Sequence, residues 1–475
     1  MLGSIPLGNL NSGPLLPKHN RHDRSSSGSS SPPVPPSTGR ILFNLRRYKQ
    51  LQIIALFLVV LSLLVFYTPD RASHFELFPS SEGTFGVLGS GEKSWVKLFR
   101  EGLTSLGREA DEAFLLGETE PVAYISQLET FIQMSFPTHL KEDILTSVRT
   151  FWNRAAIDPE DATADTLRKL PAMVEYKNVW QTDKKTSDAD GGGWTAKNPG
   201  WKWELMDDEK ADEWLRQTFG VDSQSQESKS TVEAVWNDLE LGILKSDMWR
   251  YLVLLIEGGV YTDTDTTCLR PVHQWGRGAD TYPGSHSYGL PSMIIGVEAD
   301  VGSREDWHDW WARPIQISQW TLSSAPHHPI LVDVIRRIHH STTIALSWLT
   351  HRESLAVSYE AAGNAERAKK IRLISLLESK GVEGEDEKIL GKGVSVMEWT
   401  GPGVWTDAVM AYLKARHQVT WPTFKNIQRP LRIGEIVVLP VTGFSPGVGL
   451  FGAQNQWHEE AMVLHSFSGS WKTDG

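Results

Sequence analysis

The chain has 475 residues, a length that allows two or three domains and a full-sized hydrophobic core. Hydrophobic residues make up 40% and charged residues 22%, a mixture that excludes collagen-like, wholly disordered and multi-span membrane proteins. The formal net charge is −11, and no stripe of basic residues interleaves with aromatic ones, so we expect no nucleic-acid partner. The single cysteine, Cys268, excludes an intrachain disulfide.

The first fifty residues differ from the rest in charge and composition. They contain seven basic residues against one acidic residue, and the stretch from Ser25 to Ser37 consists mostly of serine and proline. A segment of this composition cannot build a packed core. The sequence therefore predicts a disordered basic tail over residues 1–50.

An uncharged apolar run, LQIIALFLVVLSLLVFY, follows from Leu51 to Tyr67. It is near the lower length limit, about 17 residues, for a helix that spans a membrane. A cleaved signal peptide would start close to the N-terminus, whereas fifty residues precede this run. Basic residues crowd its N-terminal flank, so the positive-inside rule predicts a single-pass signal anchor with a cytosolic tail and a lumenal C-terminal part. The short span suits a thin early secretory membrane.

Residues 68–171 are predicted to form a linker followed by a helical stem. The linker contains Ser, Gly and Pro, and apolar residues then recur every three or four positions, as in Trp95, Leu98 and Phe99. The same spacing also fits a first layer of the domain that follows, and both interpretations stay open.

Residues 172–475 alternate strand-like and helix-like patterns. The predicted strands are Tyr176–Trp180, Gly259–Asp263 and Ser292–Val297. One predicted helix begins near Asp207, and a longer one covers Val232–Glu257. A charged segment, Glu353–Lys388, resembles an insertion. Such alternation favours an α/β domain with a mostly parallel sheet, which binds ligands at the carboxyl ends of its strands.

The block from Lys245 to Cys268 carries the most chemical information. On a helix, Asp247, Arg250 and Tyr251 would share one face because they are spaced i, i+3 and i+4. Asp263 and Asp265 end the next strand and point the same way, so together they can bind one divalent cation, which can hold a nucleoside diphosphate. A D-x-D pair by itself more often serves a turn.

This block resembles the core of glycosyltransferase family 32, in which a helix with S/A-D-x-x-R-Y leads through G-G-x-Y to D-x-D. KNVWQT (Lys177 to Thr182) and the stretch from Asn198 to Leu215 are similar to upstream motifs of that family. The first of these departs from the family pattern, with Val179-Trp180 in place of Ile-His. The downstream motifs look like those of initiation-specific α-1,6-mannosyltransferases of the fungal Golgi. They are Gly296 to Leu331, Glu398 to Val409 and His465 to Lys472.

The resemblance implies a GT-A type fold, a manganese ion, GDP-mannose as donor, a high-mannose N-glycan as acceptor, and retention of configuration in a Golgi enzyme. It assigns Asp263 and Asp265 as catalytic and metal-binding residues, with His465 as the third metal ligand. The implied donor-binding residues are Trp180, Gln181, Asp247, Arg250, Tyr251, Tyr261, Ser470, Trp471 and Lys472. The expected acceptor-binding residues are Glu298, Trp307, Trp310 and Trp311.

Structural roles compete with two of these assignments. Asp247 and Arg250 also fit a salt bridge that holds their helix on the sheet, and Trp180 fits a core tryptophan.

Other functions remain as alternatives. The D-T-D-T-T sequence also fits the start of haloacid-dehalogenase phosphatases, but the Gly-Asp pair that such enzymes need is absent from the chain. A mannosyltransferase acting on inositol phosphoceramide is a second alternative, although such proteins look like multi-span ones. A third is a non-catalytic subunit of a mannosyltransferase complex, which the intact Asp263, Asp265 and His465 disfavour.

Overall fold

The computed structural model describes residues 119–154, 170–184, 190–220, 231–285, 289–301, 311–377, 390 and 393–468. The predicted tail, the predicted span at 51–67 and the linker lie outside these ranges. Within them, no helix combines the length and the apolar character that crossing a membrane requires.

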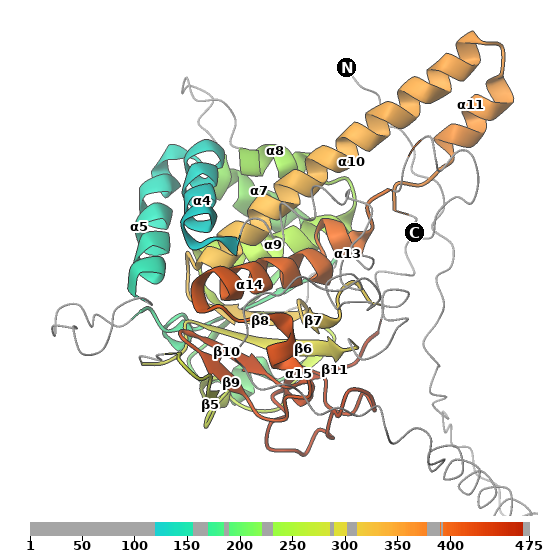
Figure 1. Ribbon diagram of the computed structural model, residues 1–475. Helices are drawn as coiled ribbons and strands as arrows, with labels where there is room; N and C mark the ends of the chain where they lie inside the picture. The colour runs from blue at the N-terminus through green and yellow to red at the C-terminus, as the bar shows by residue number, and fades with distance from the viewer. Residues whose placement is uncertain are drawn as a thin grey trace, which may run out of the picture. The chain divides into compact units, whose positions relative to one another are not determined.

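A mixed sheet forms the centre of the described fold (Figure 1). Its strand order is β2-β1-β3-β8-β6-β10-β9-β5, and β7 pairs with β6. The strands are β1 Asn178–Thr182, β2 Lys202–Met206, β3 Gly259–Thr262, β5 Asp280–Thr281, β6 Met293–Asp300, β7 Ile315–Ile317, β8 Thr321–Ser324, β9 Leu431–Ile433 and β10 Ile436–Leu439.

The prediction of an α/β domain is confirmed, but the sheet is not parallel throughout. β2, β1, β3, β6 and β10 run in one direction, because β1 is parallel to β2 and β3, and β6 is parallel to β10. β8 lies antiparallel between β3 and β6, because it continues in the direction of β7, which is itself antiparallel to β6. The predicted strands lie within two or three residues of β1, β3 and β6.

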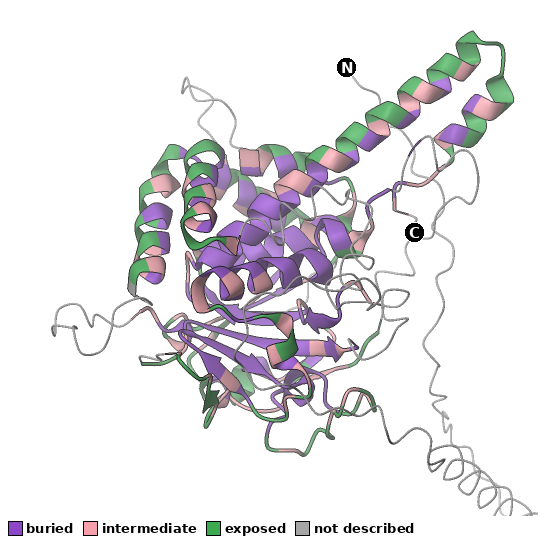
Figure 2. Ribbon diagram, viewed as in Figure 1, coloured by how far each residue is buried: buried purple, intermediate pink, exposed green. Residues whose placement is uncertain are grey.

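Helices cover one face of the sheet and enclose the larger hydrophobic core (Figures 1 and 2). They are α4 Pro121–Ser135, α5 Thr138–Arg154, α7 Asp208–Phe219, α8 Thr231–Asp238, α9 Gly242–Ile256, the N-terminal part of α10 Pro329–Ala361, α13 Val396–Trp399 and α14 Pro402–His417. α11 Ala365–Arg372 packs against the far end of α10, away from the sheet (Figure 1). The helix predicted over Val232–Glu257 is thus two helices, α8 and α9. Gly242 opens the second one, and glycine is unfavourable within a helix.

Two helices of the predicted stem belong to this core. α4 packs against α10 and α14, and the fully buried Tyr124 of α4 directs its hydroxyl at the Asp333 carboxylate of α10, 3.3 Å away. The described part of residues 68–171 is therefore a first layer of the α/β unit, the second interpretation that the sequence allowed.

The predicted insertion is the distal part of a helical hairpin. The C-terminal half of α10 packs against α11 (Figure 1). Arg372 binds both Glu353 and Glu360 across the pair. These ion pairs are largely exposed, so their contribution to stability is small.

The opposite face of the sheet carries a second core. α6 Trp194–Lys197, α15 Val441–Phe444 and a small sheet of β4 Thr266–Cys268 and β11 Val463–His465 cover it. The structure also describes short 3₁₀ helices at Met173–Glu175, Val272–Gln274 and Trp421–Phe424. The antiparallel pairing of β11 with β4 places His465 opposite Thr266, next to the D-x-D turn.

Candidate functional site

The D-x-D turn begins where β3 ends, and hydrogen bonds hold its first aspartate by the backbone. The Asp263 N–H donates to the carbonyl of Trp320 at 2.9 Å. The Asp263 carbonyl accepts from Gln181 Nε2 at 3.0 Å and from Thr266 Oγ1 at 2.6 Å. The position of the turn is therefore fixed from β1, from the segment before β8 and from β4.

His465 joins the two aspartates across 200 residues of sequence. Its Nε2 lies 3.0 Å from Asp265 Oδ1, and one ligand atom from each of Asp263, Asp265 and His465 lies within 4.8 Å of the others. The structure thus brings together the three predicted metal ligands. Two carboxylates and an imidazole form a donor set that suits a divalent metal such as Mn²⁺.

The two carboxylates have different electrostatic surroundings. Burial would raise the pKa of Asp265, but hydrogen bonds from His465 and from the backbone and hydroxyl of Ser468 outweigh burial and lower it to about 2. Burial raises the pKa of Asp263, and the Arg250 guanidinium opposes that rise. Asp265 is therefore the more firmly ionised of the pair at neutral pH.

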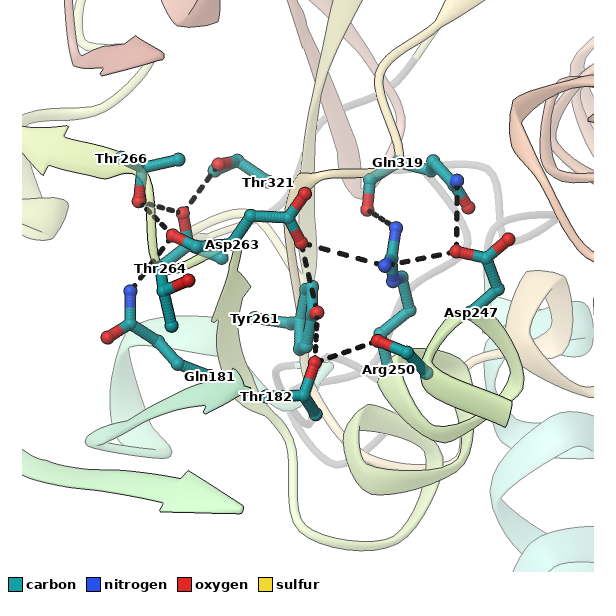
Figure 3. Close-up of polar contacts among 12 residues, drawn as sticks. Gln181, Thr182, Asp247, Arg250, Tyr261, Asp263, Thr264, Thr266, Gln319 and Thr321 are labelled. Carbon is teal, nitrogen blue, oxygen red and sulfur yellow. Dashed lines mark hydrogen bonds and ion pairs between the residues drawn. The ribbon is translucent and has the colours of Figure 1, made fainter. Parts of the chain in front are cut away.

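Arg250 on α9 faces the D-x-D turn (Figure 3). One terminal nitrogen lies 3.0 Å from Asp247 Oδ1 and 3.6 Å from Asp263 Oδ1, and the other donates to the Gln319 carbonyl at 3.3 Å. The guanidinium also lies 4.8 Å from the centre of the Tyr261 ring. Its buried Nε has no hydrogen-bond partner among the described residues, so the side chain keeps an unused donor.

The buried side chains of Asp247 and Tyr251 hold Arg250 in place, Asp247 by an ion pair and Tyr251 through Gln319. Asp247 accepts from Gln319 Nε2 at 3.2 Å and from Thr400 Oγ1 at 3.0 Å, and burial raises its pKa to about 6. The Tyr251 hydroxyl lies 2.6 Å from Gln319 Oε1 and 3.1 Å from the Thr400 carbonyl. Both side chains are almost fully buried, so in this structure they contact the chain itself.

Tyr261 connects the aspartate to the end of β1. Its hydroxyl lies 3.0 Å from Asp263 Oδ1 and 2.9 Å from Thr182 Oγ1, and Thr182 in turn lies 2.8 Å from Ser246 Oγ (Figure 3). Burial raises the pKa of Tyr261, so its hydroxyl keeps its proton. This chain of hydroxyls links β1, α9 and β3 at the site.

Trp180 and Gln181 of β1, both predicted to bind the donor, contact other parts of the chain in the structure. Trp180 is 6% exposed, and its indole N–H donates to the Gly258 carbonyl at 3.0 Å. Gln181 is also buried and accepts from Trp203 Nε1 at 2.8 Å while it donates to Asp263. Trp180 therefore occupies the core position that was the alternative to stacking on a base.

The predicted acceptor residues are only partly described. Glu298 lies near the end of β6 and accepts from Gln316 Nε2 at 2.9 Å. Burial raises the pKa of Glu298, while Gln316 and the nearby His465 lower it. Trp311 packs edge-on against Phe451 with ring centres 5.6 Å apart. The predicted residues outside the described ranges are Trp307, Trp310, Ser470, Trp471 and Lys472.

Sequence reasoning missed several residues that organise the site. Gln319 contacts Asp247, Arg250 and Tyr251, and Trp320 contacts both the D-x-D turn and the His465 ring. Both lie in the short connection between β7 and β8. The only local signal is a polar residue and a tryptophan between two short apolar runs, which does not indicate a site.

Comparison with known proteins agrees with this geometry. Residues 192–281 match the family model described as "Glycosyltransferase sugar-binding region containing DXD motif". The initiation-specific α-1,6-mannosyltransferase of Schizosaccharomyces pombe is 34% identical over 63% of this chain and 64% of its own length. The enzyme of the same name from Candida albicans is 33% identical over 63% of this chain and 72% of its own length.

Two further matches are more distant. The Saccharomyces cerevisiae protein of the same name is 28% identical over 49% of this chain and 64% of its own length. The solved structure of the PaToxG glycosyltransferase matches with a TM-score of 0.22 at 15% identity, over 47% of this chain and 86% of that one, a likeness too low to support an inference.

The match thus spans a little under two thirds of the Schizosaccharomyces pombe protein and almost three quarters of the Candida albicans one. The family model, which matches residues 192–281, includes the D-x-D turn around which the described site is built. The chain therefore belongs to the glycosyltransferase family whose sugar-binding region contains a DXD motif, the family 32 that its sequence motifs resemble.

Proposed function

We propose that this chain is a metal-dependent retaining mannosyltransferase that transfers mannose from GDP-mannose to a mannose of a high-mannose N-linked glycan. The new linkage would be α-1,6, as the names of the relatives suggest. The observation that carries the proposal is the convergence of Asp263, Asp265 and His465, with ligand atoms within 4.8 Å of one another, at the carboxyl end of β3.

The donor set fits a divalent metal. Two carboxylates and a ring nitrogen meet in a partly buried place, and Asp265 is ionised at any pH well above its pKa of about 2. A bound Mn²⁺ would supply positive charge for the diphosphate of the donor as the sugar bond breaks. Asp263, Asp265 and His465 are the residues that would hold it.

Other residues of the chain would bind and orient the donor and the acceptor. The positive charge of the Arg250 guanidinium compensates the negative charge of Asp263, and its Nε has no partner among the described residues. We expect the guanidinium to bind an oxygen of the sugar nucleotide. Asp247 holds Arg250 directly by an ion pair, and Tyr251 holds it through Gln319. Glu298 lies beside the same group of charged residues, where its carboxylate would bind a hydroxyl of the sugar or of the acceptor.

The rest of the donor and acceptor sites follows from the family resemblance. Ser470, Trp471 and Lys472 would close over the diphosphate, with Lys472 neutralising the leaving group. Trp307, Trp310 and Trp311 would stack on the rings of a neutral glycan.

The cellular setting is part of the same proposal. We expect residues 51–67 to anchor the protein in the Golgi membrane as a single-pass type II protein, with a GT-A type domain in the lumen. It would act there alone or within a glycosyltransferase complex.

The test is a transfer assay with the full-length chain in detergent, Mn²⁺, a panel of sugar nucleotides and a high-mannose N-glycan. We expect one added hexose from GDP-mannose only, placed in α-1,6 linkage by linkage analysis and abolished by EDTA. The control is the Asp263→Ala, Asp265→Ala variant, which should show no transfer. A folded wild-type chain that transfers glucose or galactose instead, or that transfers equally with EDTA present, would refute the proposal.

A further inference from the structure

We propose that Trp320 is a positioning residue that fixes the His465 imidazole in the orientation required to bind metal. The inference rests on the proposed metal-dependent function. Trp320 is assigned no contact with metal or substrate, but it contacts both the D-x-D turn and His465.

The first support is the contact of two aromatic rings with His465. The indole of Trp320 stacks on the imidazole with ring centres 4.2 Å apart and planes 29° apart. The Phe467 ring also contacts the imidazole, with ring centres 4.0 Å apart and planes tilted by 46°. Because the imidazole cannot tilt out of its plane without losing this contact, the stacking holds the ring in a plane in which Nε2 reaches Asp265.

The second support is a polar bond that His465 lacks. A histidine that binds metal usually donates its other ring nitrogen to a carboxylate or carbonyl, which fixes the ring. The Nδ1 of His465 is buried and has no hydrogen-bond partner in the described part of the chain. The orientation of the ring therefore depends on aromatic stacking instead of the usual hydrogen bond.

The third support is the rigidity of Trp320 itself. It is 5% exposed, packs edge-on against Phe444, and accepts the Asp263 N–H through its carbonyl at 2.9 Å. The next residue begins β8, and Thr321 hydrogen-bonds to Thr262 of β3. One residue thus holds the D-x-D turn by its backbone and the distant histidine by its side chain.

The experiment measures Mn²⁺ binding to the full-length chain by calorimetry and by the electron paramagnetic resonance signal of free Mn²⁺. We expect Trp320→Leu to weaken Mn²⁺ affinity by about 10-fold, the lower end of the effect of residues that orient metal ligands. Trp320→Phe, which keeps a ring to stack, should stay within about 3-fold of wild type. Trp275→Leu is the matched control, because Trp275 lies in the same core without contacting His465, and it should leave the affinity unchanged.

A double-mutant cycle separates positioning from a general loss of structure. If Trp320 acts through His465, Trp320→Leu should have little further effect on Mn²⁺ affinity in a His465→Ala chain. Unchanged affinity in folded Trp320→Leu, an equal loss in Trp320→Phe and Trp320→Leu, or fully multiplicative losses in the double variant would each overturn the inference.

The same measurements distinguish this inference from the proposed function. A wild-type chain that binds Mn²⁺ with the expected dependence on Trp320 but transfers no mannose would leave the inference standing and refute the function. A chain that transfers mannose while Trp320→Leu keeps full Mn²⁺ affinity would do the reverse. Wild-type protein that binds no Mn²⁺ would refute both.

Discussion

Two buried arginines in this protein have similar exposure but different hydrogen bonding. Arg313 is 2% exposed, and all three of its nitrogens are bonded. It donates to Asp407 at 2.6 and 2.5 Å, to Glu398 at 2.7 and 2.8 Å, and to the Ala312 carbonyl at 2.6 Å. Short bidentate bonds of this kind are the strong ones, so Arg313 locks α13 and α14 together.

Arg250 is 3% exposed, yet it is bonded more loosely. Its contacts to chain oxygens are 3.0, 3.3 and 3.6 Å long, and its Nε has no partner among the described residues. An unpaired donor in a buried place costs stability unless a ligand takes it up. The difference indicates that Arg313 stabilises the fold, and the unpaired Nε of Arg250 is the observation behind the proposal that Arg250 binds the sugar nucleotide.

The largest expected effect comes from breaking the saturated cluster. Arg313→Met would leave Glu398 and Asp407 buried without a counter-charge, and we expect the free energy of unfolding to fall by about 3–5 kcal/mol. Urea unfolding followed by circular dichroism measures this. A loss below about 1 kcal/mol would show that the cluster does not stabilise the fold.

The converse change removes the unsaturated arginine. Arg250→Met should cost less stability than Arg313→Met, because Asp247 keeps its bonds from Thr400 and Gln319. We expect kcat/KM for GDP-mannose to fall about 100-fold, the loss typical of a donor aimed at developing charge. If stability fell as far as in Arg313→Met while kcat/KM stayed unchanged, the comparison would be reversed.

The contrast between a residue at the site and one in the core can also be tested with two tyrosines, because Tyr→Phe removes a single hydroxyl at each position. Tyr261→Phe removes the hydroxyl that lies 3.0 Å from Asp263, and we expect transfer to fall about 10-fold. Tyr124→Phe removes a buried hydroxyl directed at Asp333, remote in sequence from the D-x-D turn, and should leave transfer unchanged. Each variant should lose about 1 kcal/mol of stability. Equal effects on transfer would mean that the Tyr261 hydroxyl has no special role.

The smallest expected effect is a pH dependence that comes from Asp247. Its pKa is about 6 in the folded protein against an ordinary value of 3.8, so the folded state binds a proton more tightly than the unfolded state. Stability from this group is therefore present at low pH and is lost as pH rises through 6. Between pH 7 and pH 5 we expect a gain of about 1 kcal/mol in wild type.

Asp247→Asn provides the comparison, because asparagine does not titrate. Urea unfolding at pH 5 and pH 7 should show that the variant lacks the gain seen in wild type. An identical pH dependence in the two proteins would assign the titration to another group.

The sequence determined those features that depend on neighbours along the chain. The alternation of strand and helix patterns predicted the α/β class. The strand pattern before Asp263 and Asp265 located them closely, although β3 ends at Thr262 and both lie in the turn between β3 and β4. Asp207 caps α7 because its side chain accepts from Lys210 N–H three residues on, a local bond that sequence patterns capture. The order of motifs identified the family.

Only the tertiary structure decided which distant residues meet. The family resemblance implied His465 as a partner of the aspartates, but the structure gives the reason, which is that β11 pairs with β4. Gln319 and Trp320, which the sequence did not indicate, reach the site because β8 runs back between β3 and β6. The tertiary structure also decided that Trp180 packs in the core and that α4 packs on α10. Strand pairing and side-chain packing between segments far apart in sequence leave no periodic pattern, so one sequence predicts the elements and the motif but not the residues that hold the motif in place.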